Sequence, residues 1–145
     1  MRREFATNIG VEASPLAVWN VLTDFGEYPE WNSFLLKVRG TPRVGAWVRF
    51  KFDLPRGFRA WACARVLKAE TGRELRWVGG VPGLFRAEHY FILDASGGSE
   101  LTFLHGEIFT GALLALVWPV LSRGGKEVYE AMNIALKKRA ERTAG

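Results

Sequence analysis

Cysteine is almost absent from this sequence, since Cys63 is the only one in 145 residues. An internal disulfide is therefore impossible, and a disulfide-stapled secreted scaffold is excluded. The first ten residues, MRREFATNIG, lack the apolar stretch that follows the basic residues of a secretory signal. The longest apolar run, ALLALVWPVL at residues 112–121, is far shorter than the roughly 20 residues that span a bilayer. Together these features predict a cytoplasmic protein.

The motifs of the common catalytic classes are also missing. The sequence contains neither G-x-S-x-G nor H-E-x-x-H. GGVPGL at residues 79–84 precedes a predicted strand, so no helix N-terminus follows it to hold a phosphate. His105-Gly106-Glu107 matches one half of the zinc-deaminase signature, but the required C-x-x-C half is absent. We therefore predict no metal and no cofactor.

The net charge of +5 does not by itself indicate a nucleic-acid partner. The basic residues are scattered along the chain, and the one dense basic run is KKRAER at residues 137–142. Because no basic stripe or recognised binding module accompanies the charge, no nucleic-acid binding is predicted. The sequence has no repeat, no linker and no low-complexity tract, and its length is typical of one domain. Residues 1–145 are therefore predicted to form a single domain.

The N-terminal part of the sequence predicts a strand followed by two short helices. Residues 3–11 alternate between apolar and polar, as a half-buried strand does. A Ser-Pro start signal predicts a helix over residues 14–24. A second short helix is expected to begin at Pro29, which would place Trp31 and Phe34 on one helix face.

The middle of the sequence predicts an antiparallel meander, and hence an α+β fold. Alternating patterns predict strands over residues 48–54, 58–70, 74–78, 86–93 and 100–109. A turn is expected at residues 55–57, and the ASGGSE segment at residues 95–100 is a hairpin signal. Three small residues share the inward face of the strand after the first turn, and they leave volume unfilled there: Ala60, Ala62 and Ala64.

A long helix is predicted to end the chain, from about residue 121 to residue 142. Val128, Met132 and Leu136 repeat every four residues and form an apolar stripe. This stripe is expected to pack in the concave face of the sheet, against Phe50 and Phe52.

This arrangement resembles the START-related SRPBCC superfamily, which includes polyketide cyclase/dehydrase-like and birch-pollen-allergen-like proteins. The resemblance is carried by Val18-Trp19 before Asp24, by the aromatic-Pro-x-Trp of residues 28–31, by HYFIL, and by GGSELTFLHGEIFTG. It implies a helix-grip fold, in which a curved seven-stranded antiparallel sheet wraps around a long C-terminal helix, with two short helices after the first strand. It also implies a cavity for an apolar or amphipathic small molecule, but no single activity.

Candidate site residues are the aromatic and polar side chains of the predicted inward faces. His89, His105 and Glu107 share those faces, because a strand has a period of two. Burial would disfavour their charged forms unless they pair, and the alternative is that they are satisfied polar groups of the core. The predicted cavity mouth is the GGVPG loop with residues 27–34. The full set of predicted ligand contacts is Trp31, Phe34, Phe50, Phe52, Trp77, His89, Phe91, Phe103, His105, Glu107 and Met132.

The sequence favours binding of a small hydrophobic ligand, such as a lipid or polyketide, over catalysis. One alternative is a cyclase or hydratase that uses His89, His105 or Glu107 as acid or base. Another is a protein-interaction module that acts through the basic surface and residues 112–121. That apolar segment suggests a lid, a dimer contact, transient contact with an anionic membrane, or simple burial at the start of the terminal helix. Whether the protein is a monomer or a homodimer is left open, as is any role of the outward Trp47 and Trp61.

Overall fold

The computed structural model describes residues 1–54 and 57–144. The turn predicted at residues 55–57 therefore lies mostly outside the described residues. The strands are β1 (Arg2–Val11), β2 (Leu35–Gly40), β3 (Trp47–Leu54), β4 (Phe58–Glu70), β5 (Glu74–Val81), β6 (Phe85–Asp94) and β7 (Leu101–Thr110). The helices are α1 (Pro15–Thr23), the 3₁₀ turn η1 (Phe25–Glu27), α2 (Tyr28–Trp31), α3 (Leu114–Leu121) and α4 (Gly125–Ala144).

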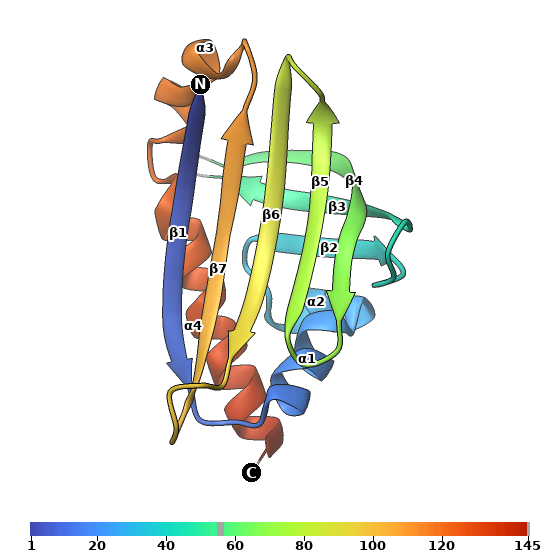
Figure 1. Cartoon of the computed structure of the whole chain (residues 1–145), viewed down its shortest axis with the longest axis vertical. Coiled ribbons are helices and arrows are strands. Elements are labelled where there is room, and N and C mark those ends of the chain that lie inside the picture. The colour runs from blue at the N-terminus through green and yellow to red at the C-terminus, as the bar shows by residue number, and fades with distance from the viewer. Residues whose placement is uncertain (55–56, 145) are drawn as a thin grey trace.

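The seven strands form one sheet in the order β1-β7-β6-β5-β4-β3-β2, and every neighbouring pair is antiparallel. The sheet curves around α4, which lies across its concave side (Figure 1). The two short N-terminal helices lie at the end of the sheet where α4 terminates (Figure 1). The predicted α+β helix-grip fold is thus confirmed.

The N-terminal helices fold for local reasons that the sequence indicated. The Ser14 hydroxyl caps α1 by accepting from the Ala17 N–H at 3.1 Å, with proline at the first helical position. Tyr28, from the aromatic segment before β2, is fully buried, and its hydroxyl donates to the Leu22 carbonyl. Burial raises the pKa of Tyr28 well above its usual value. Tyr28 therefore fixes α2 against α1 and does not face a ligand.

Phe34 does not lie on a helix face with Trp31, contrary to the prediction. α2 ends at Trp31 because the Asn32 side chain replaces the next helical turn. Its Oδ1 accepts from the N–H groups of Phe34 at 2.9 Å and Leu35 at 2.8 Å. This side-chain cap turns the chain into β2 and sends Phe34 to the concave side, apart from Trp31.

The terminal helix begins at Gly125 and not near residue 121, because residues 122–124 break the chain direction, with Gly124 at φ +72°. Residues 112–121 form mostly the separate helix α3. α4 packs on β1, α1 and β7 rather than on Phe50 and Phe52. Met132 and Leu136 of the predicted stripe are buried, and a cavity separates the helix from the two phenylalanines.

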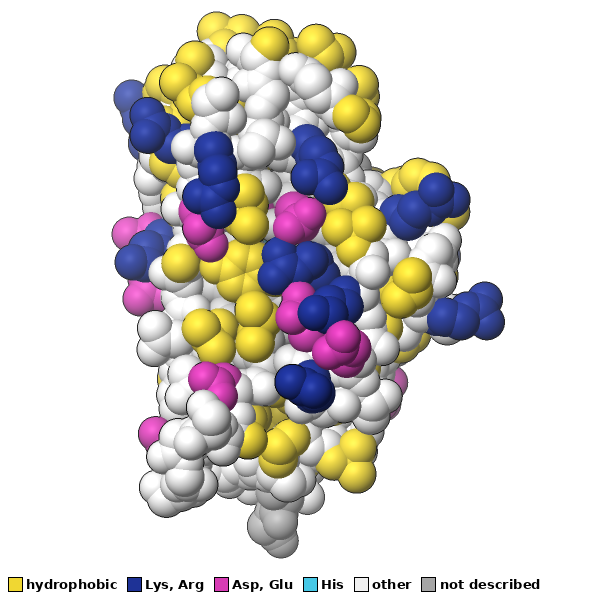
Figure 2. Space-filling model, viewed as in Figure 1, with side chains coloured by type: hydrophobic (Ala, Val, Ile, Leu, Met, Phe, Trp, Pro, Cys, Tyr) yellow, Lys and Arg dark blue, Asp and Glu magenta, His cyan; other side chains and the backbone are white. Residues whose placement is uncertain are grey.

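α3 is only half buried, so simple burial of residues 112–121 is wrong. Leu114 is buried, whereas Leu116 is 77% and Val120 75% exposed. The preceding residue Leu113 donates its N–H to the Leu84 carbonyl, which joins α3 to the β5–β6 turn. Figure 2 shows apolar side chains gathered at this end of the molecule. None of the helices in residues 1–54 and 57–144 has both the length and the apolar character to cross a membrane.

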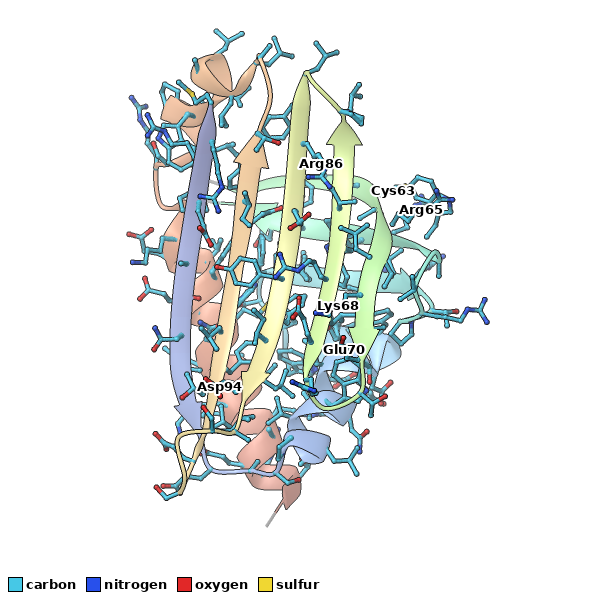
Figure 3. All side chains as sticks on the ribbon, in the orientation of Figure 1. Cys63, Arg65, Lys68, Glu70, Arg86 and Asp94 are labelled. Atoms are coloured by element: carbon cyan, nitrogen blue, oxygen red, sulfur yellow. The ribbon has the colours of Figure 1, made fainter. Side chains whose placement is uncertain are left out.

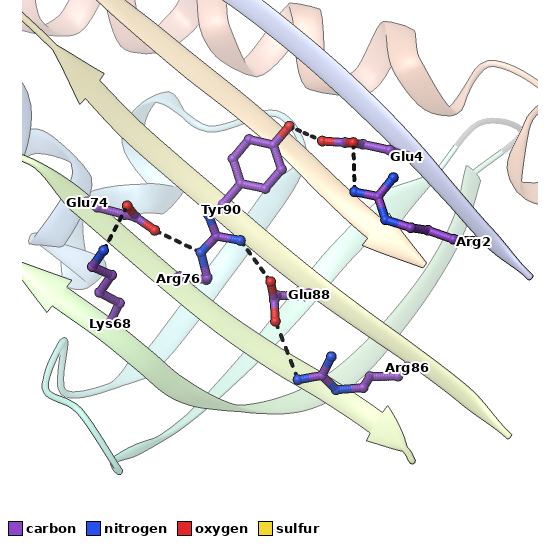
Figure 4. A network of polar contacts seen from close by, with 8 residues as sticks. All are labelled: Arg2, Glu4, Lys68, Glu74, Arg76, Arg86, Glu88 and Tyr90. Carbon is purple, nitrogen blue, oxygen red and sulfur yellow. Dashed lines mark hydrogen bonds and ion pairs between the residues drawn. The ribbon is translucent and has the colours of Figure 1, made fainter. Parts of the chain in front are cut away.

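The convex side of the sheet carries a polar network (Figure 4). Arg76 lies between Glu74 at 2.8 Å and Glu88 at 2.7 Å. The Tyr90 hydroxyl donates to Glu4 at 2.6 Å across β7. Because this side of β1, β5, β6 and β7 is polar and exposed to water, the apolar interior lies on the other side, toward α4.

Candidate functional site

A cavity of about 310 Å³ lies between the concave side of the sheet and the start of α4. This volume is at the lower end of the range for small-molecule pockets. Phe5, Phe50, Phe52, Phe85 and Phe109 form much of its wall. The lining of the described residues is therefore mainly aromatic and apolar.

The cavity follows two rows of the sheet. Phe5, Glu107, His89 and Trp77 stand opposite one another across β1, β7, β6 and β5, and all four line the cavity.

The second row, one step toward α3, consists of Phe109, Ala87 and Gly79. One step the other way, Thr7, His105, Phe91 and Leu75 form a fully packed row. The cavity thus occupies the α3 end of the sheet, and core residues close its other end.

Small side chains create the volume, as the sequence indicated. Ala62 and Ala64 on β4 line the cavity opposite Phe50 and Val48 of β3. Gly79 belongs to the same wall, and a Cβ there would lie 2.8 Å from the Cys63 carbonyl oxygen. A larger residue at any of these positions would occupy the cavity or push β4 away from β5.

The structure brings together six of the eleven predicted contacts and separates five. The cavity is lined by Phe34, Phe50, Phe52, Trp77, His89 and Glu107. The others lie elsewhere in the described chain, and these are Trp31, Phe91, Phe103, His105 and Met132.

Each of the five has a physical reason to lie elsewhere. Trp31 faces a separate depression with α1 and Arg139. Phe91, Phe103 and His105 point to the correct side of the sheet but one or two rows too deep. Met132 is fully buried in the core. Of the predicted mouth, Gly79, Gly80 and Phe34 line the cavity.

A chain of buried hydrogen bonds leads from β1 to the cavity. The Thr7 hydroxyl donates to the His105 carbonyl at 2.6 Å and accepts from the Asn133 side-chain amide at 2.8 Å. Asn133 Oδ1 lies 2.8 Å from His105 Nδ1, and His105 Nε2 lies 2.7 Å from His89 Nε2. His89 is the last member of this chain and lines the cavity.

The direction of each bond follows from its first member, because a carbonyl only accepts. Thr7 gives its one proton to the His105 carbonyl, so the Asn133 group facing it must be the NH₂. Asn133 Oδ1 therefore accepts from His105 Nδ1–H. Burial, with His89 nearby, holds the pKa of His105 well below its usual value, so its Nε2 is bare and accepts from His89 Nε2–H.

Tyr129 completes the polar part of the cavity from the α4 side. Its hydroxyl donates to Glu107 Oε1, and its ring stacks on His105 at 11° with 5.0 Å between centroids. Burial and the neighbouring Glu107 raise the pKa of Tyr129 well above its usual value, so the hydroxyl keeps its proton. Glu107 Oε1 also lies 3.6 Å from His89 Nδ1.

Sequence reasoning missed Thr7, Tyr129 and Asn133. The available signal was the spacing of Gly125, Tyr129 and Asn133, which recur every four residues and share one face of α4. In the part of the chain that the structure describes, no group of three or more His, Cys, Asp or Glu side chains is arranged to hold a metal ion.

Comparison with known proteins places this geometry among related folds. The sequence model of the family described as "Polyketide cyclase / dehydrase and lipid transport" matches residues 2–141. No curated protein gives a significant sequence match.

Among solved structures, the di-domain ARO/CYC StfQ from the steffimycin biosynthetic pathway superposes with a TM-score of 0.79 at 13% identity. The match covers 100% of this chain and 53% of StfQ, so this chain spans about half of that protein. A START superfamily protein from Mycobacterium smegmatis gives a TM-score of 0.76 at 17% identity, covering 97% of this chain and 98% of its own.

A norcoclaurine synthase point mutant from Thalictrum, solved with a transition-state analogue, gives a TM-score of 0.73 at 13% identity. It covers 100% of this chain and 98% of its own. At these identities the three structures show a common fold alone.

Proposed function

Because the chain belongs to the polyketide cyclase/dehydrase and lipid transport family, we propose that it binds a small hydrophobic or amphipathic molecule in its cavity. The proposed ligands are lipids or polyketides, and the proposed role of the protein is to transport or sequester them. The observation that carries this proposal is a cavity of about 310 Å³ with aromatic and small apolar walls and a single polar corner. Such a lining binds apolar ligands by removing their surface from water.

A cyclase or hydratase remains the alternative from another class, and it would use the same polar corner. His89 and Glu107 line the cavity, whereas His105 is sealed behind His89. An acid–base role requires a reacting atom within about 3 Å of one of the two cavity-facing groups. Native mass spectrometry of protein purified from its own host would identify a ligand that purifies with it. If the protein binds this ligand without converting it to a product, the carrier function is favoured.

Filling the cavity at Ala62 tests the proposal. Ala62→Phe is expected to weaken binding of the apolar fluorescent probe N-phenyl-1-naphthylamine by about tenfold or more, because the new ring occupies the ligand's volume. Fluorescence titration measures the dissociation constant. The matched control is Ala131→Phe, which adds the same ring on the exposed side of α4 and is expected to leave affinity unchanged. Equal binding by both variants would place the probe outside the cavity.

A further inference from the structure

We propose that the polar corner of the cavity selects ligands that donate a hydrogen bond, such as a phenol, an alcohol or an N–H group, and rejects carboxylates. This inference rests on the proposed function and adds the chemistry of the ligand's polar end. It follows from the fixed direction of the hydrogen bonds around His89, Glu107 and Tyr129.

His89 offers the cavity an acceptor. Its Nε2–H is committed to His105, so in the neutral form of the ring the remaining Nδ1 carries a lone pair. That nitrogen lies 3.6 Å from Glu107 Oε1, which is too long for a hydrogen bond. In that form two acceptors face each other, and a donor from a ligand would satisfy both.

The other polar groups of the corner present no proton to the cavity. Tyr129 donates its one hydroxyl proton to Glu107, whose carboxylate oxygens only accept hydrogen bonds. The indole N–H of Trp77 is buried in the wall and is not presented at the cavity surface. A carboxylate ligand would meet Glu107 without a facing donor, whereas a hydroxyl group meets acceptors only.

Three probes of similar shape separate these cases: 2-naphthol, 2-methoxynaphthalene and 2-naphthoate. Isothermal titration at neutral pH is expected to show 2-naphthol binding about tenfold or more tightly than its methyl ether, since the ether leaves the acceptors unpaired. 2-Naphthoate is expected to bind more weakly than the ether. Glu107→Gln, which replaces one acceptor oxygen with an NH₂ donor, is expected to reduce the naphthol preference and to improve naphthoate binding. Circular dichroism confirms that the variant is folded.

Glu88→Gln is the matched control, because Glu88 neighbours His89 on β6 but points to the convex side and pairs with Arg76. It is expected to leave the order of the three probes unchanged. If the ether binds as tightly as naphthol, or if naphthoate binds most tightly (held, for example, at the start of α4), this inference is overturned while the proposed function stands. If none of the three binds, the proposed function itself fails.

From a separate observation, we also propose that the outer face of β2, β3 and β4 docks on an anionic lipid surface. The part of the sequence that forms these strands is rich in basic residues. Residues 35–66 contain eight of the twenty Lys and Arg but one of the fifteen Asp and Glu. This segment therefore carries a charge of +7, and the rest of the chain carries −2.

Exposed apolar side chains stand among these charges. Trp47 is 61% and Trp61 43% exposed, and each ring lies under a guanidinium group, Arg65 at 4.9 Å and Arg49 at 4.7 Å. Figure 3 shows Arg65 on β4, on the side of the molecule remote from α4. Val44, in the adjoining turn, is 61% exposed.

This composition favours a lipid surface over other anionic partners. Lys and Arg are attracted to anionic headgroups, and Trp prefers the membrane interface. An exposed aliphatic side chain such as Val44 gains from contact with lipid and gains nothing from a phosphate backbone. The single acid of residues 35–66 is Asp53, which pairs with Arg59 at 3.4 Å.

Co-sedimentation with vesicles of phosphatidylcholine, with and without phosphatidylserine, tests this surface at low salt. We expect binding to the anionic vesicles alone, and the double variant Arg49→Glu/Arg65→Glu is expected to lower it by about tenfold or more. The control Arg123→Glu/Arg142→Glu changes the net charge equally at other places and is expected to keep most of the binding.

Four outcomes overturn the docking proposal. One is equal sedimentation with neutral and anionic vesicles, and another is equal loss in the two charge-reversal variants. The third is loss of binding in Leu116→Ser/Val120→Ser, which would make α3 the contact surface. Competition by single-stranded DNA at lower phosphate concentration than the vesicles would point to a nucleic-acid partner and would likewise overturn it.

Discussion

Replacing Asn133 with leucine is expected to lower the free energy of unfolding by about 3 kcal/mol. Asn133 is 2% exposed and links His105 Nδ1–H to the Thr7 hydroxyl. Leucine has nearly the same volume but accepts and donates nothing, so the His105 N–H loses its side-chain acceptor in a site that water does not reach. Each buried polar group left without a partner costs about 1 to 3 kcal/mol. Urea denaturation followed by circular dichroism measures the change.

Asn20→Leu is the matched control for this experiment. Asn20 lies exposed on α1, so the same substitution there is expected to change the free energy of unfolding by less than about 0.5 kcal/mol. Equal stability of the Asn133→Leu variant and the wild type would mean that the hydrogen-bond chain from Thr7 to His89 contributes nothing. The tautomer of His89 would then lose its structural basis, and the ligand preference inferred from it would lose its support.

The strands could be predicted from the sequence because the period of two identifies which side chains share a face of the sheet. The same period does not show which inward-facing side chains of a strand line the cavity and which lie in the packed core. His89 and His105 have the same pattern, yet His89 lines the cavity and His105 lies in the packed row behind it. Depth depends on register against neighbouring strands and on where α4 crosses, and both are tertiary properties.

The polar side of α4 could not be predicted from hydrophobic periodicity for a related reason. Tyr129 and Asn133 are buried, but they are polar, so they fall outside an apolar stripe. Their burial is stabilised by partners on β1 and β7, more than a hundred residues away for Thr7. Similarly, the separation of α3 from α4 depends on Gly124, whose positive φ ends one helix before the next begins.

The burial of His105 leads us to expect that the free energy of unfolding depends on pH. In the folded protein its pKa is well below the usual value, because burial and the adjacent His89 disfavour the imidazolium, against the opposing effect of Asn133. The groups that face it are His89, Tyr129, Asn133 and Thr7, and none of them supplies a negative charge. In the unfolded chain, His105 titrates near the ordinary histidine pKa of about 6.5.

The sign follows from the protons bound in each state. Above about pH 6.5 neither state binds a proton at His105, and the contribution to stability is fully present. Below it the unfolded chain takes up a proton that the folded protein does not, so stability falls by about 1.4 kcal/mol per pH unit. Between pH 6.5 and pH 5 the loss is expected to reach about 2 kcal/mol. The carboxylates whose pKa values are lowered, Glu74, Asp94 and Glu141, lose their contributions at lower pH.

Urea denaturation across this pH range measures the slope, and His105→Gln identifies its source. The variant is expected to be less stable at every pH, because the glutamine cannot pair with both Asn133 and His89 as the ring does. Its stability is expected to lose the dependence that one proton contributes between pH 6.5 and pH 5. A variant with the same slope as the wild type would show that His105 is protonated equally in the folded and unfolded states. The assignment of an unprotonated Nε2 to His105 would then be wrong, and with it the direction of the hydrogen bonds from Thr7 to His89.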